Sequence, residues 1–501
     1  MIDILEEVRK EQGELVALRR HFHEHPELSK KEDQTLAYIA KKLEEYGISY
    51  RLVDKGGLIA WIDGKGPGKT LLLRADVDAL PIEEGERNLS CPRVCRSQNH
   101  GVMHACGHDG HMAMQLMAAK CLQRWKDQWD GTVVLMFERG EEESGPLEYL
   151  LRYLETESPW HIDACYATHV RWDIPAGKVS VCHDAPMAGG FGFEIRIDGH
   201  GGHGSRPDLA ESPIDCFHDF YGNMQALRMR AVPPKECLTF SIGSLHSGDV
   251  LNVIPNSLTF AGTCRFFSYD HAGRRFYEEF KRILANACQT YDCRYDILHM
   301  PEPLFEVQNN PVCVAIAEKA VEKYIGADAL TDCTPWMASE TFAITSRLYP
   351  GVLTFTGIEN KEKGCGANHH TPEFDLDEDG LTYGAATCLG FALDYLAEKP
   401  DIVKIRQPGH RKQRLAHIGE ETAHKRGQFR LESGTFVFDL HLFQHHIVRL
   451  SSFILQADLL FFRRNCFFCR LFFRAACFSF CAPVFLFVFF FHPSAFFPYS
   501  G

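Results

Sequence analysis

The chain has 501 residues, of which 45% are hydrophobic and 24% are charged, and its formal net charge is −13. This length and composition predict a globular protein with two or three domains and a large core. Residues 401–501 hold 13 Lys and Arg against six Asp and Glu, so residues 1–400 carry a net charge of about −20. This net negative charge of residues 1–400 argues against nucleic acid as a partner.

Nineteen cysteines are scattered along the chain. The chain begins Met1-Ile2-Asp3 and passes directly into an amphipathic charged segment, which does not have the pattern of a signal peptide. Disulfides belong to oxidising compartments. We therefore expect reduced thiols, a cytoplasmic protein and no membrane attachment.

Periodicity and turn residues predict an α/β arrangement in the first part of the chain. Apolar residues recur at helical spacing in two N-terminal segments, and Gly47 ends the second of them. Later apolar runs have the length and composition of buried strands. The expected helices are residues 2–24 and 32–46, and the expected strands are residues 49–53, 58–62, 70–73, 132–137 and 162–169.

The stretch from Met103 to His111 places one thiol and three imidazoles between glycines, just ahead of an apolar helix. Cys106 and His108 offer two metal donors of different softness, and Gly107 between them permits close approach. A solvated His-rich turn beside a buried Cys is the alternative. The stretch indicates a metal site if other donors join it.

Polar side chains follow the apolar runs at the points where the predicted strands end. Asp76 and Asp78 follow one run, the acidic stretch 138–143 follows the next, and His169 closes a third. Ligands bind at the carboxyl ends of strands in open α/β sheets. We interpret His169 as a ligand and the two aspartates as groups that orient a metal-binding histidine. The acidic stretch fits a ligand cluster and a solvated face equally.

The pattern changes after residue 186 to β-α-β-β-α-β, the element order of a ferredoxin-like module. Because βα units resume after residue 300, we expect a split α/β domain with a mixed sheet around an inserted domain. A loop of glycines, histidines and arginine at residues 199–207 lacks the context of a nucleotide-binding motif. The predicted boundaries are 1–186 and 301–398 for the split domain, 187–300 for the insert and 399–501 for a tail.

The tail has an unusual composition, because it contains 20 of the chain's 37 phenylalanines without a clear period. Its uncharged stretch 475–491 is short for a membrane span and is broken by Pro483. We interpret the tail as the product of a shifted reading frame, dispensable for activity and outside the fold. A zinc cluster is a weaker interpretation, because the spacing is irregular among Cys466, Cys469, Cys477 and Cys481.

Several motifs together resemble the M20 metallopeptidase family in its amidohydrolase branch. That branch includes aminoacylase-like enzymes, hippurate hydrolases and auxin-conjugate hydrolases. The resemblance covers about residues 10–398. The motifs are Arg74 to Pro81, Met103 to His111, Phe137 to Glu142, His169-Val170, Gly201-Gly202-His203 and His370 to Phe374.

The resemblance implies a catalytic domain that holds two divalent cations, zinc or manganese, with cobalt or nickel as alternatives. It implies hydrolysis of an N-acyl or N-aroyl amino acid to a carboxylate and a free amino acid, with Glu141 as general base. It also implies that the insert is a lid or dimerisation domain, whose His203 stabilises the oxyanion in the partner's site of a homodimer. The implied metal ligands are Cys106, His108, Glu142, His169 and His370.

Two stretches depart from the family pattern. The usual Gln-Pro-Ala-Glu-Glu-Gly reads Glu-Arg-Gly-Glu-Glu-Glu at residues 138–143, which keeps the paired acids and changes their surroundings. The usual Ser-Glu-Asp-Phe reads Ser-Glu-Thr-Phe at residues 339–342, which removes an acid. A dipeptidase or carboxypeptidase of the same family is one alternative. A metal-holding binding protein is another, although it would not need the base Glu141.

Overall fold

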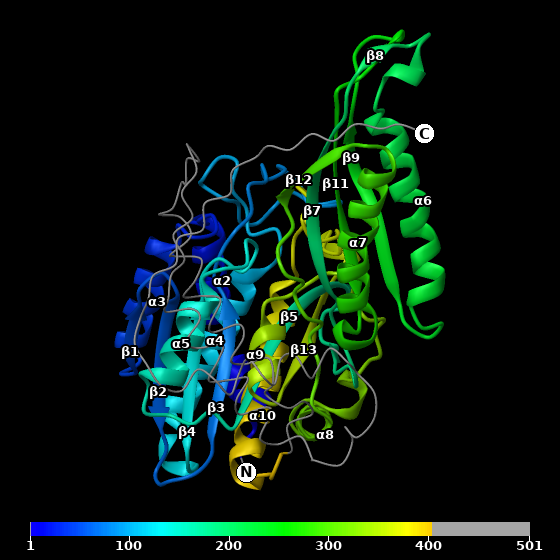
Figure 1. The fold of residues 1–501 in the computed structure, drawn as a ribbon. Helices are drawn as coiled ribbons and strands as arrows, with labels where there is room; N and C mark the ends of the chain where they lie inside the picture. Colours follow the sequence, from blue (N-terminus) through cyan, green and yellow to red (C-terminus); the bar gives the residue numbers. More distant parts are fainter. Residues whose placement is uncertain (1, 403–501) are drawn as a thin grey trace, which may run out of the picture. The chain divides into compact units, whose positions relative to one another are not determined.

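The computed structural model describes residues 2–402, so the predictions made for the tail beyond them fall outside the described residues. Figure 1 shows the arrangement of the described elements. No helix among these residues has both the length and the apolar character needed to cross a membrane. The first elements are α1 (Ile4–Lys10), α2 (Gln12–Glu24), α3 (Asp33–Glu45), β1 (Ser49–Val53), β2 (Gly57–Asp63), β3 (Thr70–Asp76), α4 (His108–Arg124), β4 (Thr132–Glu138), α5 (Leu147–Thr156), β5 (Ala164–Pro175) and β6 (Val179–Ser180).

A mixed seven-stranded sheet is built from two separate parts of the chain. Its strand order is β1-β2-β4-β3-β5-β13-β6. The pairs β4–β3, β3–β5 and β5–β13 are parallel, whereas β1–β2, β2–β4 and β13–β6 are antiparallel. The predicted mixed sheet is therefore present, and the later part of the chain supplies one of its strands. The elements of that later part are α8 (Pro311–Tyr324), α9 (Phe342–Leu348), β13 (Gly351–Glu359) and α10 (Glu378–Glu398).

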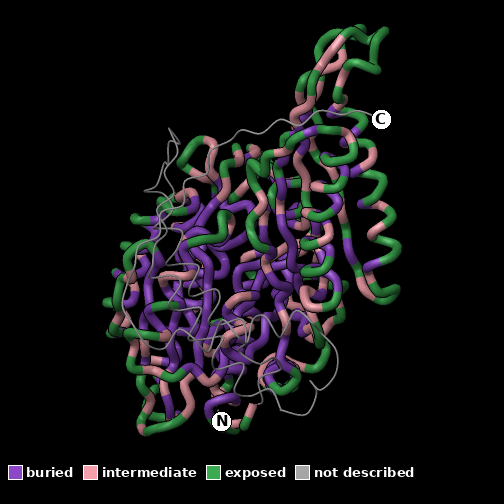
Figure 2. The backbone as a smooth tube through the Cα atoms, viewed as in Figure 1, coloured by how far each residue is buried: buried purple, intermediate pink, exposed green. Residues whose placement is uncertain are grey.

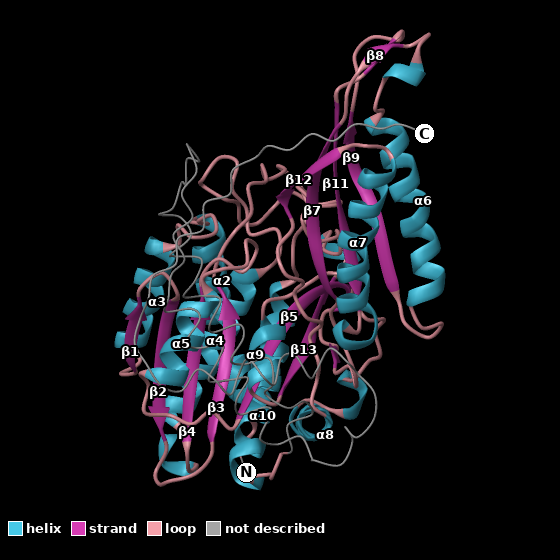
Figure 3. Ribbon diagram, viewed as in Figure 1, coloured by secondary structure: helices cyan, strands magenta, loops and turns pink. Residues whose placement is uncertain are grey.

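Helices cover both faces of this sheet, as Figure 3 shows. Successive side chains of a strand point to opposite faces. Leu71 and Leu73 therefore join a core that includes α2, α4 and α10, while Leu72 joins a second core with α5 and α9. Figure 2 shows the central strands buried along their length. Burial on both faces explains why these strands read as continuous apolar runs in the sequence.

The segment after β6 forms a separate four-stranded antiparallel sheet in the order β12-β7-β11-β9. The sheet and two helices share an aromatic core, which includes Phe193, Phe220, Phe260 and Phe280. A two-stranded antiparallel sheet pairs β8 with β10, and β8 lies within the glycine-rich stretch that we expected to be a loop. The elements are β7 (Gly189–Asp198), β8 (Gly202–His203), α6 (Pro213–Ala231), β9 (Leu238–His246), β10 (Val253–Ile254), β11 (Ser257–Phe266), α7 (Arg274–Thr290) and β12 (Arg294–His299).

The N-terminal segment differs from its prediction. The sequence predicts one helix over residues 2–24, but the structure divides it into α1 and α2 at Glu11. The Glu11 carboxylate pairs with Lys120 and Arg124 on α4. Helical spacing alone does not reveal this break, because the apolar pattern continues across it and the pairing partners are distant in sequence.

Candidate metal centre

Cys106 and His108 lie at the turn that enters α4, and Gly107 between them allows the turn to form. Gly107 adopts φ 87°, in the left-handed region, and a Cβ at this residue would lie 2.3 Å from Cγ2 of Val170. Glycine meets both conditions because it lacks a Cβ. The turn brings the thiol and the first imidazole of α4 close to β5, the strand that carries His169.

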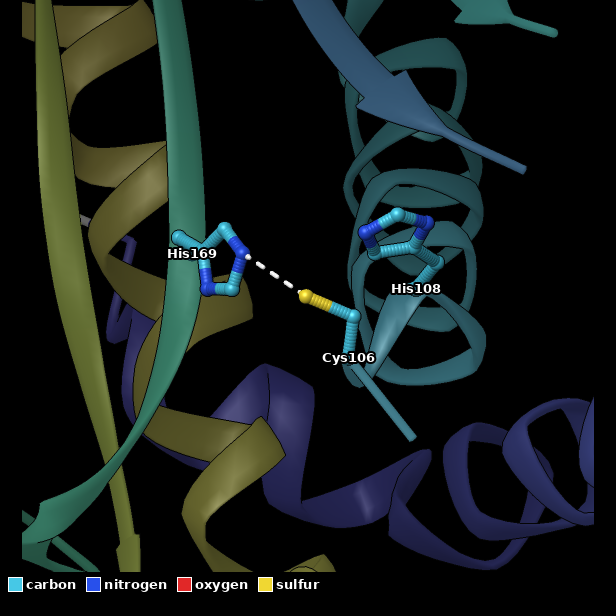
Figure 4. A group of neighbouring side chains, drawn as sticks. All are labelled: Cys106, His108 and His169. Atoms are coloured by element: carbon cyan, nitrogen blue, oxygen red, sulfur yellow. Dashed lines mark hydrogen bonds between the residues drawn. The ribbon is translucent and has the colours of Figure 1, made fainter. Parts of the chain in front are cut away.

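Cys106, His108 and His169 form a first trio of side chains that could hold a metal ion, and their donor atoms all lie within 4.8 Å of one another. Figure 4 shows the sulfur of Cys106 between the two rings, 3.6 Å from Nε2 of His169. Nδ1 of His169 lies 2.7 Å from the carbonyl oxygen of Val170, and Nδ1 of His108 lies 2.9 Å from that of Asp78. A proton on each Nδ1 would satisfy these carbonyl oxygens and leave both Nε2 lone pairs for a cation.

Cys106 also belongs to a second trio, with Glu142 and His370. Nε2 of His370 lies 3.3 Å from the Cys106 sulfur and 3.2 Å from Oε1 of Glu142. His370 is brought here by its backbone N–H, which donates to the Ala105 carbonyl at 2.9 Å. The two trios meet at one thiol, so the geometry suits two neighbouring cations with a shared sulfur ligand.

The chemistry of these donors fits divalent cations. Nε2 of His108 and Oε1 of Glu142 are buried and make no hydrogen bond among residues 2–402. These two atoms lie 4.0 Å apart, and their other ion-pair contacts are with Asp76 at 3.6 Å and His370 at 3.2 Å, respectively. A buried polar atom without a partner costs roughly 1–3 kcal/mol, so such atoms call for a ligand. Burial lowers the pKa of His169 well below its usual value, which keeps this imidazole in the neutral form that binds metal. Sulfur, nitrogen and carboxylate donors together are typical of zinc and similar cations.

The neighbouring acids Glu141 and Glu142 have different surroundings. The backbone N–H of Glu142 donates to Oδ2 of Asp78 at 3.0 Å, which fixes the backbone of Glu142 beside the second trio. Oε1 of Glu141 instead accepts a hydrogen bond from the backbone N–H of Thr341 at 2.9 Å. Burial, with Glu340 and Glu142 nearby, raises the pKa of Glu141 well above its usual value. The two carboxylates thus differ in their contacts, and with His108 they also form a further group whose donor atoms lie within 4.8 Å of one another.

Asp76 and Asp78 both contact a histidine ring nitrogen, the arrangement that we predicted for the two aspartates. Asp78 contacts Nδ1 of His108 through its carbonyl and its carboxylate. Oδ1 of Asp76 lies 2.6 Å from Nδ1 of His111, whose Nε2 accepts from the backbone N–H of Val170 at 2.9 Å. His111 was not predicted to act here. Its position three residues after His108 on one helix was the available signal, since residues at that spacing share a face.

The buried Arg74 on β3 joins three acids beneath the site. Its guanidinium lies 2.7 Å from Oε2 of Glu138, 2.8 Å from Oδ2 of Asp76 and 2.8 Å from Oε1 of Glu340. A buried guanidinium needs such partners, because an unpaired charge in the interior is strongly destabilising. Arg74 thereby links Asp76, which contacts His111, to Glu340, whose neighbour Thr341 donates to Glu141.

The two stretches that depart from the family pattern contact each other through the side chains of Glu138 and Thr341. Oγ1 of Thr341 accepts from Nη2 of Arg74 at 2.9 Å and donates to Oε1 of Glu138 at 2.6 Å. The family's acid is thus absent at residue 341, whereas Glu138 adds an acid, and both side chains contact the guanidinium of Arg74. Arg139, at another altered position, pairs with Glu32 at 2.7 Å and holds the turn that precedes the paired acids.

Glu138 provides a test of this network through pH. Burial raises the pKa of Glu138 to about 7, whereas glutamate in an unfolded chain titrates near 4.3. The folded state holds this proton more tightly. Its contribution to stability is therefore complete below about pH 4.3 and is lost as the pH rises through 7. We expect Glu138→Gln, which cannot lose a proton, to gain stability relative to the parent by up to about 3 kcal/mol between pH 5 and 8.

The measurement is the Tm of both proteins at intervals from pH 5 to 8. The difference, variant minus parent, should rise with pH. Glu143→Gln is the matched control, because Glu143 is exposed and its substitution should give a flat difference. A Glu138→Gln difference that stays constant or falls with pH would show that Glu138 is ionised throughout this range.

An aromatic wall stands beside the first trio. The Trp336 ring packs edge to face on His169, with centroids 5.4 Å apart, and lies 4.8 Å from the ring of His369. His369 also packs on Phe374, and neither of its ring nitrogens has a hydrogen-bond partner among the described residues. Sequence analysis did not identify Trp336 or His369, because nothing in their local sequence indicates that they meet the trio.

His203 is exposed on β8 and is not brought to the cluster by the structure. Its Nδ1 accepts from the backbone N–H of Ser205 at 3.1 Å and lies 2.8 Å from the Ser205 hydroxyl. Within the described part of the chain, no hydrogen bond or ion pair joins it to either trio. The five predicted ligands thus meet at one place, whereas His203 stays apart from them.

Comparison with known proteins gives consistent results. The model of peptidase family M20/M25/M40 matches residues 72–394. The chain is 33% identical over 389 residues to IAA-amino acid hydrolase ILR1-like 2 of Arabidopsis thaliana, covering 77% of this chain and 86% of the relative. It is 31% identical to thermostable carboxypeptidase 1 of Saccharolobus solfataricus, covering 76% of this chain and 94% of the relative.

A solved structure agrees with these matches. The YXEP protein of Bacillus subtilis, described as a dinuclear metal binding peptidase of the M20 family, superimposes with a TM-score of 0.65 at 28% identity. The match covers 78% of this chain and 99% of that one. The resemblance inferred from the motifs is confirmed, and the chain belongs to peptidase family M20/M25/M40.

Proposed function

We propose that the chain is an amidohydrolase that cleaves the amide bond of N-acyl or N-aroyl amino acids, giving a carboxylate and a free amino acid. Membership of the family makes it a metal-dependent hydrolase of amide bonds. The observation that carries the proposal is the pair of ligand trios that share Cys106 beside Glu141, a carboxyl outside both trios. The relative named for acting on IAA-amino acid supports the class of substrate.

The two trios would hold the two cations, with zinc or manganese as the expected metals and cobalt or nickel as alternatives. When bound, the cations lower the pKa of the attacking water and polarise the amide carbonyl. Glu141 would act as general base. Because Oε1 of Glu141 accepts the N–H of Thr341, Oε2 is the atom that takes the proton of the water and returns it to the leaving nitrogen.

A carboxypeptidase activity is the second candidate, because the thermostable carboxypeptidase is nearly as similar as the plant hydrolase. A peptide bond is also an amide, so the same two trios and base would serve both reactions. The experiment is a panel of N-acetyl, N-benzoyl and N-arylacetyl amino acids beside dipeptides and N-blocked dipeptides. Product amino acids are quantified with each of the four metals added back to metal-free protein.

We expect the acyl amino acids to be hydrolysed with higher kcat/KM than the dipeptides. Higher kcat/KM for the peptides would favour the carboxypeptidase. Metal-dependent binding of these compounds without release of product would indicate the non-catalytic alternative. Glu141→Gln serves as the inactive control, which distinguishes turnover at this site from a contaminating hydrolase.

The segment from β7 to β12 supports a further part of the proposal, a ferredoxin-like lid and dimerisation domain. Its element order and its strand order β12-β7-β11-β9 are those of that module. Ten of the 14 exposed large hydrophobic side chains among residues 2–402 lie in it. Exposed apolar side chains gathered in one unit are typical of an interface. We propose that this unit joins two copies of the chain.

His203 would then act in the partner's site. Because its Nδ1 accepts from Ser205, its proton lies on Nε2, which can donate to a developing oxyanion. We expect His203→Ala and Glu141→Gln each to be nearly inactive. Mixing them should restore about a quarter of parent activity, because half of the dimers are hybrids and each hybrid holds one complete site.

The mixture is assayed after subunit exchange has been demonstrated with two differently tagged copies. Mixing Glu141→Gln with Glu142→Gln is the matched control and should restore nothing, because both substitutions fall in the same half of the site. No recovery from the His203→Ala mixture despite exchange would place His203 outside the partner's site.

A further inference from the structure

Two half-buried cysteines, Cys182 and Cys333, lie side by side near the metal centre. Their sulfur atoms are 3.6 Å apart. Cys182 follows β6, and Cys333 belongs to the segment that connects α8 to α9. Closing a disulfide requires the sulfurs to approach to about 2.05 Å. A change of about 1.5 Å is within the reach of side-chain rotation, so the pair is placed to form a bond without a change of fold.

The surroundings of Cys333 favour its thiolate. The Ser180 hydroxyl donates to its sulfur at 3.1 Å, and Nη1 of Arg171 donates at 3.5 Å. The Cys182 thiol, with Ser180 and Arg171, lowers the pKa of Cys333 to about 6, while burial and Asp173 act in the opposite direction. The thiolate is the nucleophilic form of cysteine. Cys333 therefore combines a reactive sulfur, partial exposure and a second thiol in contact.

We propose that Cys182 and Cys333 form a peroxide-sensitive dithiol that closes to a disulfide and lowers the hydrolytic activity reversibly. The Cys333 thiolate attacks one oxygen of a hydroperoxide, giving a sulfenic acid and hydroxide as the O–O bond breaks. The Cys182 thiol then attacks the sulfenic sulfur, which forms the S–S bond and releases water. In total the two thiols give up two electrons and two protons, and hydrogen peroxide is reduced to two molecules of water.

The segment that carries Cys333 connects the dithiol to the metal centre. Three residues further on, Trp336 packs on His169. Eight residues further on, the N–H of Thr341 donates to Glu141. Arg171 also joins this segment to β5, because it donates to the Thr334 carbonyl at 2.7 Å and lies two residues after His169 on that strand. Drawing Cys333 towards Cys182 therefore shifts the wall beside the first trio.

A second thiol pair in the chain provides an internal control. The sulfurs of Cys216 and Cys288 are 3.7 Å apart, but both residues are buried in the aromatic core of the β7–β12 unit. Peroxide cannot reach them readily, so proximity without exposure should leave them reduced. The exposed Cys237 provides the opposite case, because it is exposed and contacts no other thiol among residues 2–402.

The experiment treats the full-length, metal-loaded protein with hydrogen peroxide, blocks free thiols, and digests with trypsin. Cys182 is the only cysteine in peptide 179–196, and Cys333 is the only one in peptide 324–347. We expect these two peptides to appear linked, two hydrogens lighter than their sum, and to separate on treatment with dithiothreitol. Peptides that stay unlinked while Cys237 is oxidised, or a Cys216–Cys288 link that forms first, would overturn the dithiol.

The effect on activity rests on the proposed function and is measured separately. We expect the oxidised parent to lose at least tenfold in kcat/KM, because misplacement by about 1 Å can cost a site about 10²-fold. Dithiothreitol should restore it. Cys333→Ser should form no link and keep its activity in peroxide. Formation of the disulfide without loss of activity would overturn the regulatory effect. Formation of the disulfide in a protein that hydrolyses none of the substrates would support the dithiol and overturn the proposed function.

Discussion

Replacing Cys106 by serine should remove both cations and abolish metal-dependent hydrolysis. Cys106 is the one side chain common to the two trios, so its loss leaves each trio with two donors. A neutral hydroxyl does not replace a thiolate as a ligand for these metals. Loss of an outer partner alone costs roughly 10- to 100-fold in metal affinity. We expect a larger loss here, with metal content falling from two ions per chain towards none.

The measurement is metal content by elemental analysis after removal of free ions, together with activity on the preferred substrate. Cys121→Ser is the matched control, because Cys121 is also buried, on the helix α4 that follows Cys106, but has no place in either trio. That variant should keep two ions per chain. A Cys106→Ser protein that retains both ions would show that the trios do not share the thiol.

Glu141→Gln should lower kcat by roughly 10²- to 10⁴-fold, the range that general acid–base catalysis contributes. The glutamine oxygen can still accept the N–H of Thr341, so the side chain should keep its position. KM should change little, because Glu141 acts on the proton of the water rather than on binding. The measurement is steady-state kinetics on the preferred acyl amino acid. A loss of kcat below tenfold would assign the base to another residue.

The catalytic sheet was predictable because its signals are local. The apolar runs that became β3, β4 and β5 are buried on both faces, and each delivers polar side chains at its end. The donors Cys106 and His108 were visible for the same reason, since a glycine between two ligands is a local pattern. Convergence of these ends at one edge of the sheet follows from their parallel direction.

Residues that act through distant contacts were not predictable. Arg74 meets Glu138 and Glu340 only after β3 and β4 pair and the segment before α9 returns to the sheet. Compared with the family pattern, an acid is lost at residue 341 and an acid is gained at residue 138. The sequence did not show that these two changes are related, because only the structure shows the side chains of Thr341 and Glu138 in contact. The break at Glu11 was hidden similarly, because its partners lie on α4.

Glu141 and Glu142 are identical neighbours to which we assign different roles, general base and metal ligand. The metal content of Glu141→Gln and Glu142→Gln, prepared in parallel without excess metal, tests this assignment. Glu142→Gln should fall from two ions per chain to one, because a neutral amide replaces a ligating carboxylate of the second trio, and excess metal should restore part of its activity. Glu141→Gln should keep two ions and remain inactive at any metal concentration. If Glu141→Gln is the variant that loses an ion, the roles assigned to the two acids are wrong.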